Sequence, residues 1–337
     1  MTKKPSKTHK PKHAIHGWLV LDKPRNMTST QAVAKIRHHL RPQKIGHAGT
    51  LDPLATGILP IALGEATKTI PYTMRAKKEY DFTMAWGEAR DTDDGEGKCI
   101  ATSSIRPSRD AITASLAKFT GRIWQTPPVY SAIKQDGKRA YALARAGKPP
   151  QLSPRQVTIH ALTLTAHNPS DETTRLCATT GKGVYIRALG RDIARACGSE
   201  AYISGLRRLR VGGFDSTHAI AFNTIEKLGE KLVDKTDAHA LLHPYLLPLE
   251  SALADMPQMA LRECEVTQLR HGQAISMDGK PQLVMKPEGT IYDESSDSSE
   301  HSECIVGMYE GHAVALMRAQ PHAHIAKPVR VFNPHHV

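Results

Sequence analysis

Residues 46–57 read Gly-His-Ala-Gly-Thr-Leu-Asp-Pro-Leu-Ala-Thr-Gly, and they place one carboxylate in a short, glycine-rich segment. The glycines permit backbone conformations with positive φ and a close approach to a ligand. Asp52 precedes Pro53, whose ring fixes φ and favours a turn. An Asp before Pro is most often a turn or cap residue, because its side chain bonds nearby backbone amides. Taken alone, Asp52 is therefore compatible with a structural role as well as a catalytic one.

The chain around this segment predicts an α+β fold with a mostly antiparallel sheet, because strands outnumber helices and are separated by Pro and Gly turns. The apolar residues 18–21 predict the first strand, and Thr28 with Gln31 forms a capping box that begins a helix. Between Tyr80 and Trp86 apolar and polar residues alternate, which predicts a half-buried strand with Tyr80 facing inward. Further strands are expected at 157–164 and 175–180, and helices at 108–119 and from about 187 to 196.

Two segments resemble ligand-binding loops only superficially. Residues 91–97, Asp-Thr-Asp-Asp-Gly-Glu-Gly, lack the ligand spacing and the distant Glu of a calcium loop. We expect them to form a solvated acidic turn. Residues 181–183, Gly-Lys-Gly, lack the Walker spacing and the following Ser or Thr, so nucleotide hydrolysis is not expected.

The charge of the chain points to a polyanionic partner. Its 337 residues carry a net charge of +12 and have a pI of about 9.5. Lys and Arg gain affinity for nucleic acid by releasing counterions from phosphates, although ribosomal structural proteins and proteins that bind anionic membranes share this balance. No apolar run is long enough to span a bilayer, which predicts a soluble cytoplasmic protein. The five cysteines form no Cys-x-x-Cys pair and none lies near a His at ligand spacing, so no metal site is expected.

Residues 46–57 closely resemble the catalytic motif of the bacterial TruB-type tRNA pseudouridine synthases, which isomerise uridine 55 in the T loop of tRNA. Residues 22–24 (Asp-Lys-Pro), 124–134 (Trp-Gln-Thr-Pro-Pro-Val-Tyr-Ser-Ala-Ile-Lys) and 185–187 (Tyr-Ile-Arg) carry the same resemblance in the same order. It extends over about residues 16–250. It implies a pseudouridine synthase catalytic domain and an isomerisation that requires neither a redox cofactor nor a metal.

The resemblance implies three catalytic residues. Asp52 takes the place of the family nucleophile, and Arg187 that of the arginine that pairs with it. A carboxylate in a water-poor pocket needs such a positive partner to stay ionised. Tyr80 corresponds to the tyrosine that stacks on the base and is a candidate proton acceptor at C5. Whether the nucleophile adds to C6 of the uracil or to C1′ of the ribose is open at this point.

The resemblance also implies contacts to RNA. His47 matches the family histidine that enters the T loop when bases flip out. Tyr185 matches a tyrosine beside the arginine, and Leu206 an apolar residue that packs on the target uracil. Cations near the RNA site are expected to contact phosphates, namely Lys23, Arg207, Arg208 and Arg210. For Arg210 a solvated surface position without an RNA contact is an equal alternative.

The chain is expected to divide into three parts. Residues 1–15 form a basic, disordered tail, residues 16–250 the catalytic domain, and residues 251–337 a β-rich module whose placement resembles the family's C-terminal PUA-type RNA-binding domain. Within the last module we expect a short helix near 266–272, strands at 283–285, 304–309, 313–317 and 329–332, and an acidic loop insertion at 288–303.

These features together predict an enzyme that converts uridine 55 of the tRNA T stem-loop, as a monomer without an obligatory protein partner. Two alternatives stay open. A guide-dependent rRNA pseudouridine synthase shares the motifs but works with partner proteins and a guide RNA. A non-catalytic tRNA chaperone would use only the basic surface and the C-terminal module. The complete set of Asp52, Tyr80 and Arg187 favours an enzyme, because a binding protein needs no ionised Asp in its pocket.

Overall fold

The computed structural model describes residues 12–131, 133–135, 137–148, 150–170, 172–232, 238–254, 256–278, 304–320 and 324–333. The predicted strand at 283–285, the acidic insertion at 288–303 and nearly all of the basic tail lie outside these residues.

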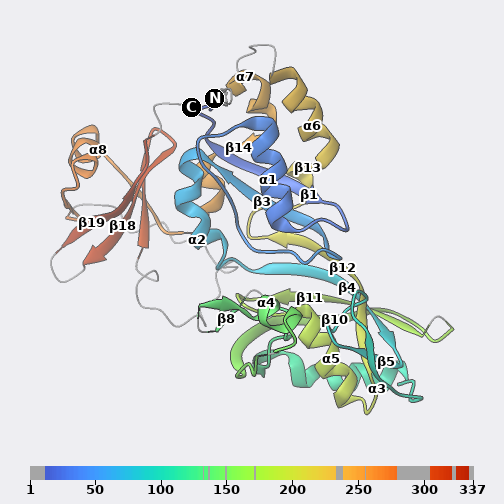
Figure 1. Cartoon of the computed structure of the whole chain (residues 1–337). Coiled ribbons are helices and arrows are strands. Elements are labelled where there is room, and N and C mark those ends of the chain that lie inside the picture. Colours follow the sequence, from blue (N-terminus) through green and yellow to red (C-terminus); the bar gives the residue numbers. More distant parts are fainter. Residues whose placement is uncertain are drawn as a thin grey trace.

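A ten-stranded sheet runs through the main body of the molecule (Figure 1). Its strand order is β13-β1-β3-β12-β4-β11-β10-β7, with β14 paired to β1 and β2 paired to β3. Only β1 with β13 and β3 with β12 are parallel among the pairs of this sheet in the described residues, so the predicted mostly antiparallel α+β fold is confirmed. The strands are β1 (Gly17–Lys23), β2 (Ile45–His47), β3 (Thr56–Leu63), β4 (Lys78–Trp86), β7 (Gly121–Gln125), β10 (Arg155–Asn168), β11 (Thr173–Thr180), β12 (Ala201–Val211), β13 (Ala219–Ala221) and β14 (Leu246–Leu247).

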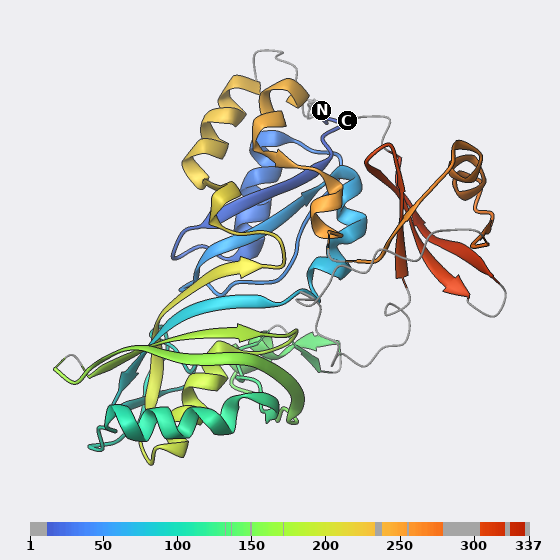
Figure 2. The same cartoon turned by 180° about the vertical axis from the view of Figure 1, so that it is seen from behind.

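Helices cover the sheet in two lobes that meet along β12 and β4 (Figure 2). In one lobe α1 packs against α6, and in the other α3 packs against α5. The capping box of α1 is formed as predicted, since Gln31 N donates to Thr28 Oγ1 at 3.0 Å and Thr28 N donates to Gln31 Oε1 at 2.8 Å. The α-helices of the main body in the described residues are α1 (Ser29–Leu40), α2 (Ile70–Thr73), α3 (Arg109–Leu116), α4 (Ala140–Arg145), α5 (Ile186–Ala196), α6 (Phe222–Lys231) and α7 (Ala238–Leu242).

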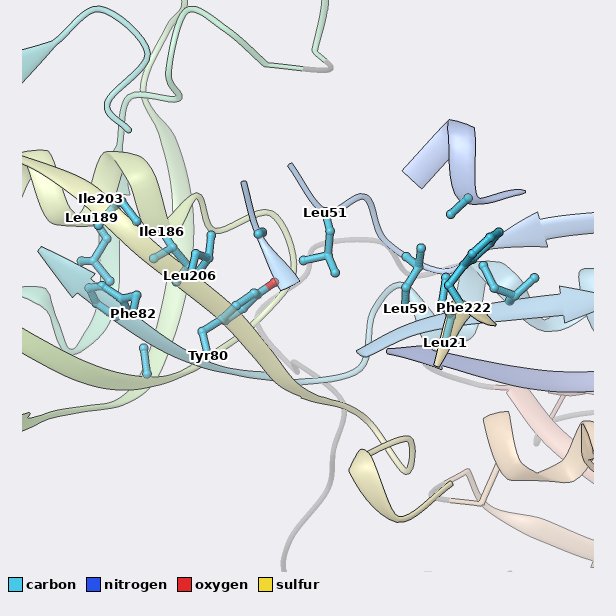
Figure 3. Close-up of a cluster of buried hydrophobic side chains, with 14 of the residues drawn as sticks. Leu21, Leu51, Leu59, Tyr80, Phe82, Ile186, Leu189, Ile203, Leu206 and Phe222 are labelled. Carbon is cyan, nitrogen blue, oxygen red and sulfur yellow. The ribbon is translucent and has the colours of Figure 1, made fainter. Parts of the chain in front are cut away.

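Strand β4 forms the floor between the two lobes. Its side chains alternate between buried and half-buried along its whole length, as the sequence predicts. Tyr80 and Phe82 face inward and join a hydrophobic core that also contains Leu51, Ile186 and Leu206 (Figure 3). The core therefore brings the residues around Asp52 and Arg187 together on one side of β4.

A second sheet of five strands forms the C-terminal module, with the order β15-β17-β18-β19-β16. It contacts the main body through a shared apolar cluster, in which Trp18 and Tyr72 pack with Val306 and Leu316. No helix in the described part of the chain is long and apolar enough to cross a membrane. The strands and the α-helix of this module are β15 (Gln258–Ala260), α8 (Glu263–Arg270), β16 (Ile275–Ser276), β17 (Cys304–Tyr309), β18 (His312–Gln320) and β19 (Ile325–Val331). Two small two-stranded sheets lie earlier in the chain. One is formed by β5 (Glu88–Arg90) and β6 (Cys99–Thr102), and the other by β8 (Lys134–Gln135) and β9 (Lys138–Arg139).

Candidate active site

The loop between β2 and β3 carries Asp52 and is fixed at both ends. Leu51 N donates to Ser29 Oγ at 2.8 Å, and the same hydroxyl donates to Leu51 O at 3.0 Å, which ties the loop to the first turn of α1. At the other end Gly57 has φ +98°, and a Cβ there would collide with the backbone carbonyl of Arg208. The glycine is required because the neighbouring strand approaches so closely. The loop is therefore a rigid support for Asp52.

Asp52 and Arg187 form an ion pair although 135 residues separate them in sequence. Arg187 Nε donates to Asp52 Oδ2 at 2.9 Å. The Asp52 side chain is 34% exposed, whereas that of Arg187 is 4% exposed. Asp52 Oδ1 has no hydrogen bond to any residue in the described part of the chain, so one carboxylate oxygen is held while the other is open. This is the arrangement expected of a nucleophile.

Three further groups orient the guanidinium of Arg187. Its Nη1 donates to Thr92 O and its Nη2 to Tyr130 O, both at 2.9 Å. The Asp94 carboxylate lies 3.6 Å from Nε and is itself 4% exposed. Burial alone would lower the pKa of Arg187, but the carboxylates of Asp52 and Asp94 raise it above its ordinary value. Arg187 is therefore a fixed positive charge behind Asp52.

The acidic segment at residues 91–97 is not the solvated turn that the sequence predicted. Asp94 is buried beside Arg187, and Asp93 accepts a hydrogen bond of 2.9 Å from Arg191 Nη1. Two acids of this segment thus neutralise two arginines of α5, which lie about 95 residues further along the chain. The sequence analysis did not identify Asp94 as a site residue. The neighbouring acids were the available signal, but the arginines that pair with them are remote in sequence.

Arg208 supports the loop from β12 and is 1% exposed. Its Nε donates to Ile58 O at 2.7 Å and its Nη2 to Gly49 O at 3.0 Å, while Nη1 lies 3.5 Å from Thr50 O. Burial lowers the pKa of Arg208, and interaction with the Tyr80 side chain partly offsets this. The expected surface contact of Arg208 with a phosphate is wrong, because its guanidinium is buried and donates its hydrogen bonds to backbone carbonyls.

Lys23 is also fully buried, at the end of β1. Its Nζ donates to Met27 O at 2.7 Å, to Pro24 O at 2.8 Å and to Pro53 O at 3.5 Å. Burial lowers the pKa of Lys23 to about 8, against the attraction of Asp52. The expected contact of Lys23 with a phosphate is therefore not met, and its bond to Pro53 O makes it a support of the catalytic loop.

The other two expected phosphate contacts lie at the surface but are paired with acids. Arg207 donates two hydrogen bonds to Asp22, of 3.0 and 2.9 Å. Arg210 lies 3.6 Å from Glu79 and 3.4 Å from Asp215. Both remain accessible, at 40% and 45% exposure, so their contact with RNA stays a prediction.

The remaining expected residues surround the ion pair. Tyr185 is the N-cap of α5, and its backbone exchanges two hydrogen bonds with the Gln125 side chain, of 2.8 and 3.1 Å. Tyr80 and Leu206 lie in the core between Ile186 and Leu51, with the Tyr80 hydroxyl directed toward Leu51 (Figure 3). His47 ends β2, and burial lowers its pKa. Their roles toward RNA remain predictions.

Comparison with family models identifies most of the main body. Residues 37–186 match the model described as TruB family pseudouridylate synthase (N terminal domain). Residues 187–254 match the model described as tRNA pseudouridylate synthase B C-terminal domain.

Similar proteins agree with this match. The protein named tRNA pseudouridine synthase B from Nitrobacter winogradskyi is 48% identical over 281 residues, which cover 83% of this chain and 77% of that protein. The protein of the same name from Caulobacter vibrioides is 47% identical over 320 residues, which cover 95% of this chain and 97% of that protein. Among solved structures, a Cbf5-Nop10-Gar1 complex matches with a TM-score of 0.69 at 24% identity, covering 94% of this chain and 84% of that chain, which supports the fold. The chain therefore belongs to the TruB family of pseudouridylate synthases, as its Asp52 motif predicts.

Proposed function

We propose that this chain is a tRNA pseudouridine synthase that isomerises uridine 55 of the T loop, with Asp52 as the nucleophile. The observation that carries the proposal is the Asp52 carboxylate, which Arg187 holds by one oxygen at 2.9 Å while the other oxygen stays open. The reaction breaks the bond between ribose C1′ and N1, turns the base and rejoins it through C5. Attack by Asp52 at C6 of the uracil or at C1′ of the ribose is compatible with these bond changes. The isomerisation is redox-neutral, so it requires no redox cofactor, and a carboxylate supplies the nucleophile.

The neighbouring side chains have distinct roles in this proposal. Arg187 pairs with Asp52 through one carboxylate oxygen and holds the side chain in a fixed orientation. Tyr80 stacks on the extruded base and accepts the proton from C5, with Leu206 packing on the uracil. His47 occupies the place of the flipped bases in the T loop, and Tyr185 packs beside the arginine.

We further propose that the enzyme acts in the cytoplasm, where its tRNA substrate is found, and as a monomer without an obligatory protein partner. The C-terminal residues 251–337 would form an RNA-binding module, and residues 16–250 the catalytic domain. The similar proteins from Nitrobacter winogradskyi and Caulobacter vibrioides are each named tRNA pseudouridine synthase B, which supports tRNA as the substrate. A guide-dependent reaction predicts no turnover without guide RNA, and a tRNA chaperone predicts none at all.

The test is pseudouridine mapping on unmodified tRNA with pure protein and no added guide or cofactor. We expect conversion at uridine 55 by the natural protein and a loss of turnover of at least about 10⁴-fold for Asp52→Ala, because the nucleophile is removed. Affinity for tRNA changes only a few-fold, since Asp52 contributes no phosphate contact.

The matched control is Asp81→Ala, which removes an aspartate of β4 that is paired with Arg175 instead of Arg187. This variant keeps full turnover. A loss of turnover in Asp52→Ala much smaller than about 10⁴-fold, or a loss of binding that accounts for its loss of activity, would contradict the assignment of Asp52 as the nucleophile. Tight tRNA binding without conversion by the natural protein would favour the chaperone or the guide-dependent enzyme.

A further inference from the structure

A basic cavity of about 480 Å³ opens beside the C-terminal end of α1. Helix α1 belongs to the lobe that contains β1 and β3 (Figure 1). Four cationic side chains line it: Lys12, Arg37, Arg41 and Lys44. No carboxylate belongs to its lining in the part of the chain that the structure describes. The cavity therefore presents positive charge only.

These cations differ from those around the catalytic pair, which bond to acids or to carbonyls. Neither Arg37 nor Lys44 forms a side-chain hydrogen bond or ion pair within the described residues, and the same is true of Lys12. Arg41 donates one weak bond, of 3.4 Å, to Leu232 O. The carboxylate of Glu65 interacts electrostatically with Lys44 from outside the lining. Four like charges with no carboxylate among the lining residues still repel one another, and an anion in the cavity would reduce this repulsion.

The elements that line the cavity also lead to the catalytic loop. Helix α1 carries Arg37 near its end, while the hydroxyl of Ser29 in its first turn bonds to Leu51 beside Asp52. Its 12 residues span about 18 Å at 1.5 Å each. Strand β2 likewise begins next to Lys44 and ends at His47. Helix α1 and strand β2 therefore each connect the lining of the cavity to the segment around Asp52.

We propose that this cavity binds a backbone phosphate of the tRNA substrate outside the T loop, an inference that rests on the proposed function. Guanidinium groups bind phosphate oxygens by two parallel hydrogen bonds, and Lys44 adds a third donor group. A phosphate contact fixes the register of the RNA but reads no base. It therefore contributes affinity for any tRNA and leaves the chemical step at Asp52 unchanged.

The test compares Arg37→Gln/Lys44→Gln with the control Arg109→Gln/Lys118→Gln, which removes two exposed cations of α3 and the turn that follows it. Affinity for tRNA is measured against salt concentration in an Asp52→Asn background, where no product accumulates. Loss of the two cavity cations makes the negative slope of log Kobs for tRNA against log salt concentration shallower by about 1 to 2. It also weakens tRNA binding roughly tenfold at about 0.1 M salt. In the catalytically intact chain KM rises and kcat stays constant, and the control changes neither slope nor KM.

The outcomes separate this inference from the function on which it rests. Absence of pseudouridine with the natural protein would overturn the proposed function, whereas turnover with an unchanged slope in Arg37→Gln/Lys44→Gln would overturn the phosphate site alone. Titration with tripolyphosphate tests the other source of phosphate. If tripolyphosphate binds in the cavity but tRNA affinity is unaffected by the double substitution, the cavity serves a free anion and the proposal is wrong. Thermal melting of each variant verifies that it is folded.

Discussion

Arg187 and Arg208 are two buried arginines that hold the same catalytic loop and are neutralised in different ways. Arg187, on α5, lies beside the carboxylates of Asp52 and Asp94. Arg208, on β12, bonds to the carbonyls of Ile58 and Gly49 and has no ion pair with a carboxylate in the described residues. The pKa of Arg187 is accordingly raised by its acids, against the effect of burial, while burial lowers that of Arg208.

The difference indicates what each site does. Acids around Arg187 make its charge stable and leave Asp52 paired by one oxygen, which suits a reacting carboxylate. Carbonyls around Arg208 accept its hydrogen bonds but supply no negative charge. The guanidinium therefore fixes the shape of the loop, although burying its charge carries a desolvation penalty. The surroundings of Arg187 fix a charged pair, and those of Arg208 fix the backbone of the loop.

The largest effect is expected at Arg187. Arg187→Met leaves Asp94 buried without its cation, which destabilises the fold by about 3–5 kcal/mol. Turnover falls by about 10³-fold, because Asp52 loses the ion pair that fixes its orientation. Urea unfolding and single-turnover pseudouridine formation measure the two effects.

A second substitution separates the two losses at this site. Asp94→Asn added to Arg187→Met removes the stranded charge and recovers part of the stability, but turnover stays low because Asp52 is still unpaired. If the double variant is no more stable than Arg187→Met, the acids of this region do not work as charge partners.

A smaller effect is expected for Arg208→Met. It strands only neutral carbonyls and removes a charge that forms no ion pair with a carboxylate in the described residues, so the loss of stability is about 2 kcal/mol. Turnover falls by about 10²-fold, because the loop that carries Asp52 shifts. Calorimetry and the same turnover assay measure it. A loss of stability equal to that of Arg187→Met would show that the two sites do not differ in the way their charges are neutralised.

Lys23 extends the comparison to pH, because it is a second buried cation that carbonyls hold. Its pKa in the folded state is about 8, below the ordinary 10.5, so between these values the unfolded chain binds more protons. Stability therefore rises with pH in this window, by about 1.5 kcal/mol from pH 8 to about pH 9.5 for this group alone. Denaturant unfolding across this range shows the rise in the natural protein and not in Lys23→Met. A rise of the same size in Lys23→Met would assign it to other groups.

Local signals in the sequence predicted the scaffold of the site. The capping box of Thr28 and Gln31 spans four residues, and the alternation from Tyr80 to Trp86 depends only on the strand itself. Both are confirmed because each depends on neighbours in sequence. The pairing of Asp52 with Arg187 joins residues 135 apart, and it was accessible only through the resemblance of the two motifs to a family.

Burial of charge was not predictable in the same way. Arg208 lies in a run of cations that reads as a basic surface, yet its partners Ile58 and Gly49 come from about 150 residues earlier in the chain. Asp94 lies in an acidic run that reads as a solvated turn, and it is buried only because α5 presents Arg187 to it. In both cases the tertiary fold overrides local composition, since a buried charge depends on partners that composition does not identify.

The smallest effect compares the caps of two helices in the two lobes. Thr28 Oγ1 accepts from Gln31 N at 3.0 Å at the start of α1, and Ser108 Oγ accepts from Ala111 N at 3.2 Å at the start of α3. Each change to alanine costs about 1 kcal/mol of stability. Only α1 also bonds to the catalytic loop, through Ser29, so Thr28→Ala lowers kcat a few-fold while Ser108→Ala leaves it unchanged. Equal turnover of the two variants, at matched loss of stability, would show that the loop does not depend on the first turn of α1 for its position.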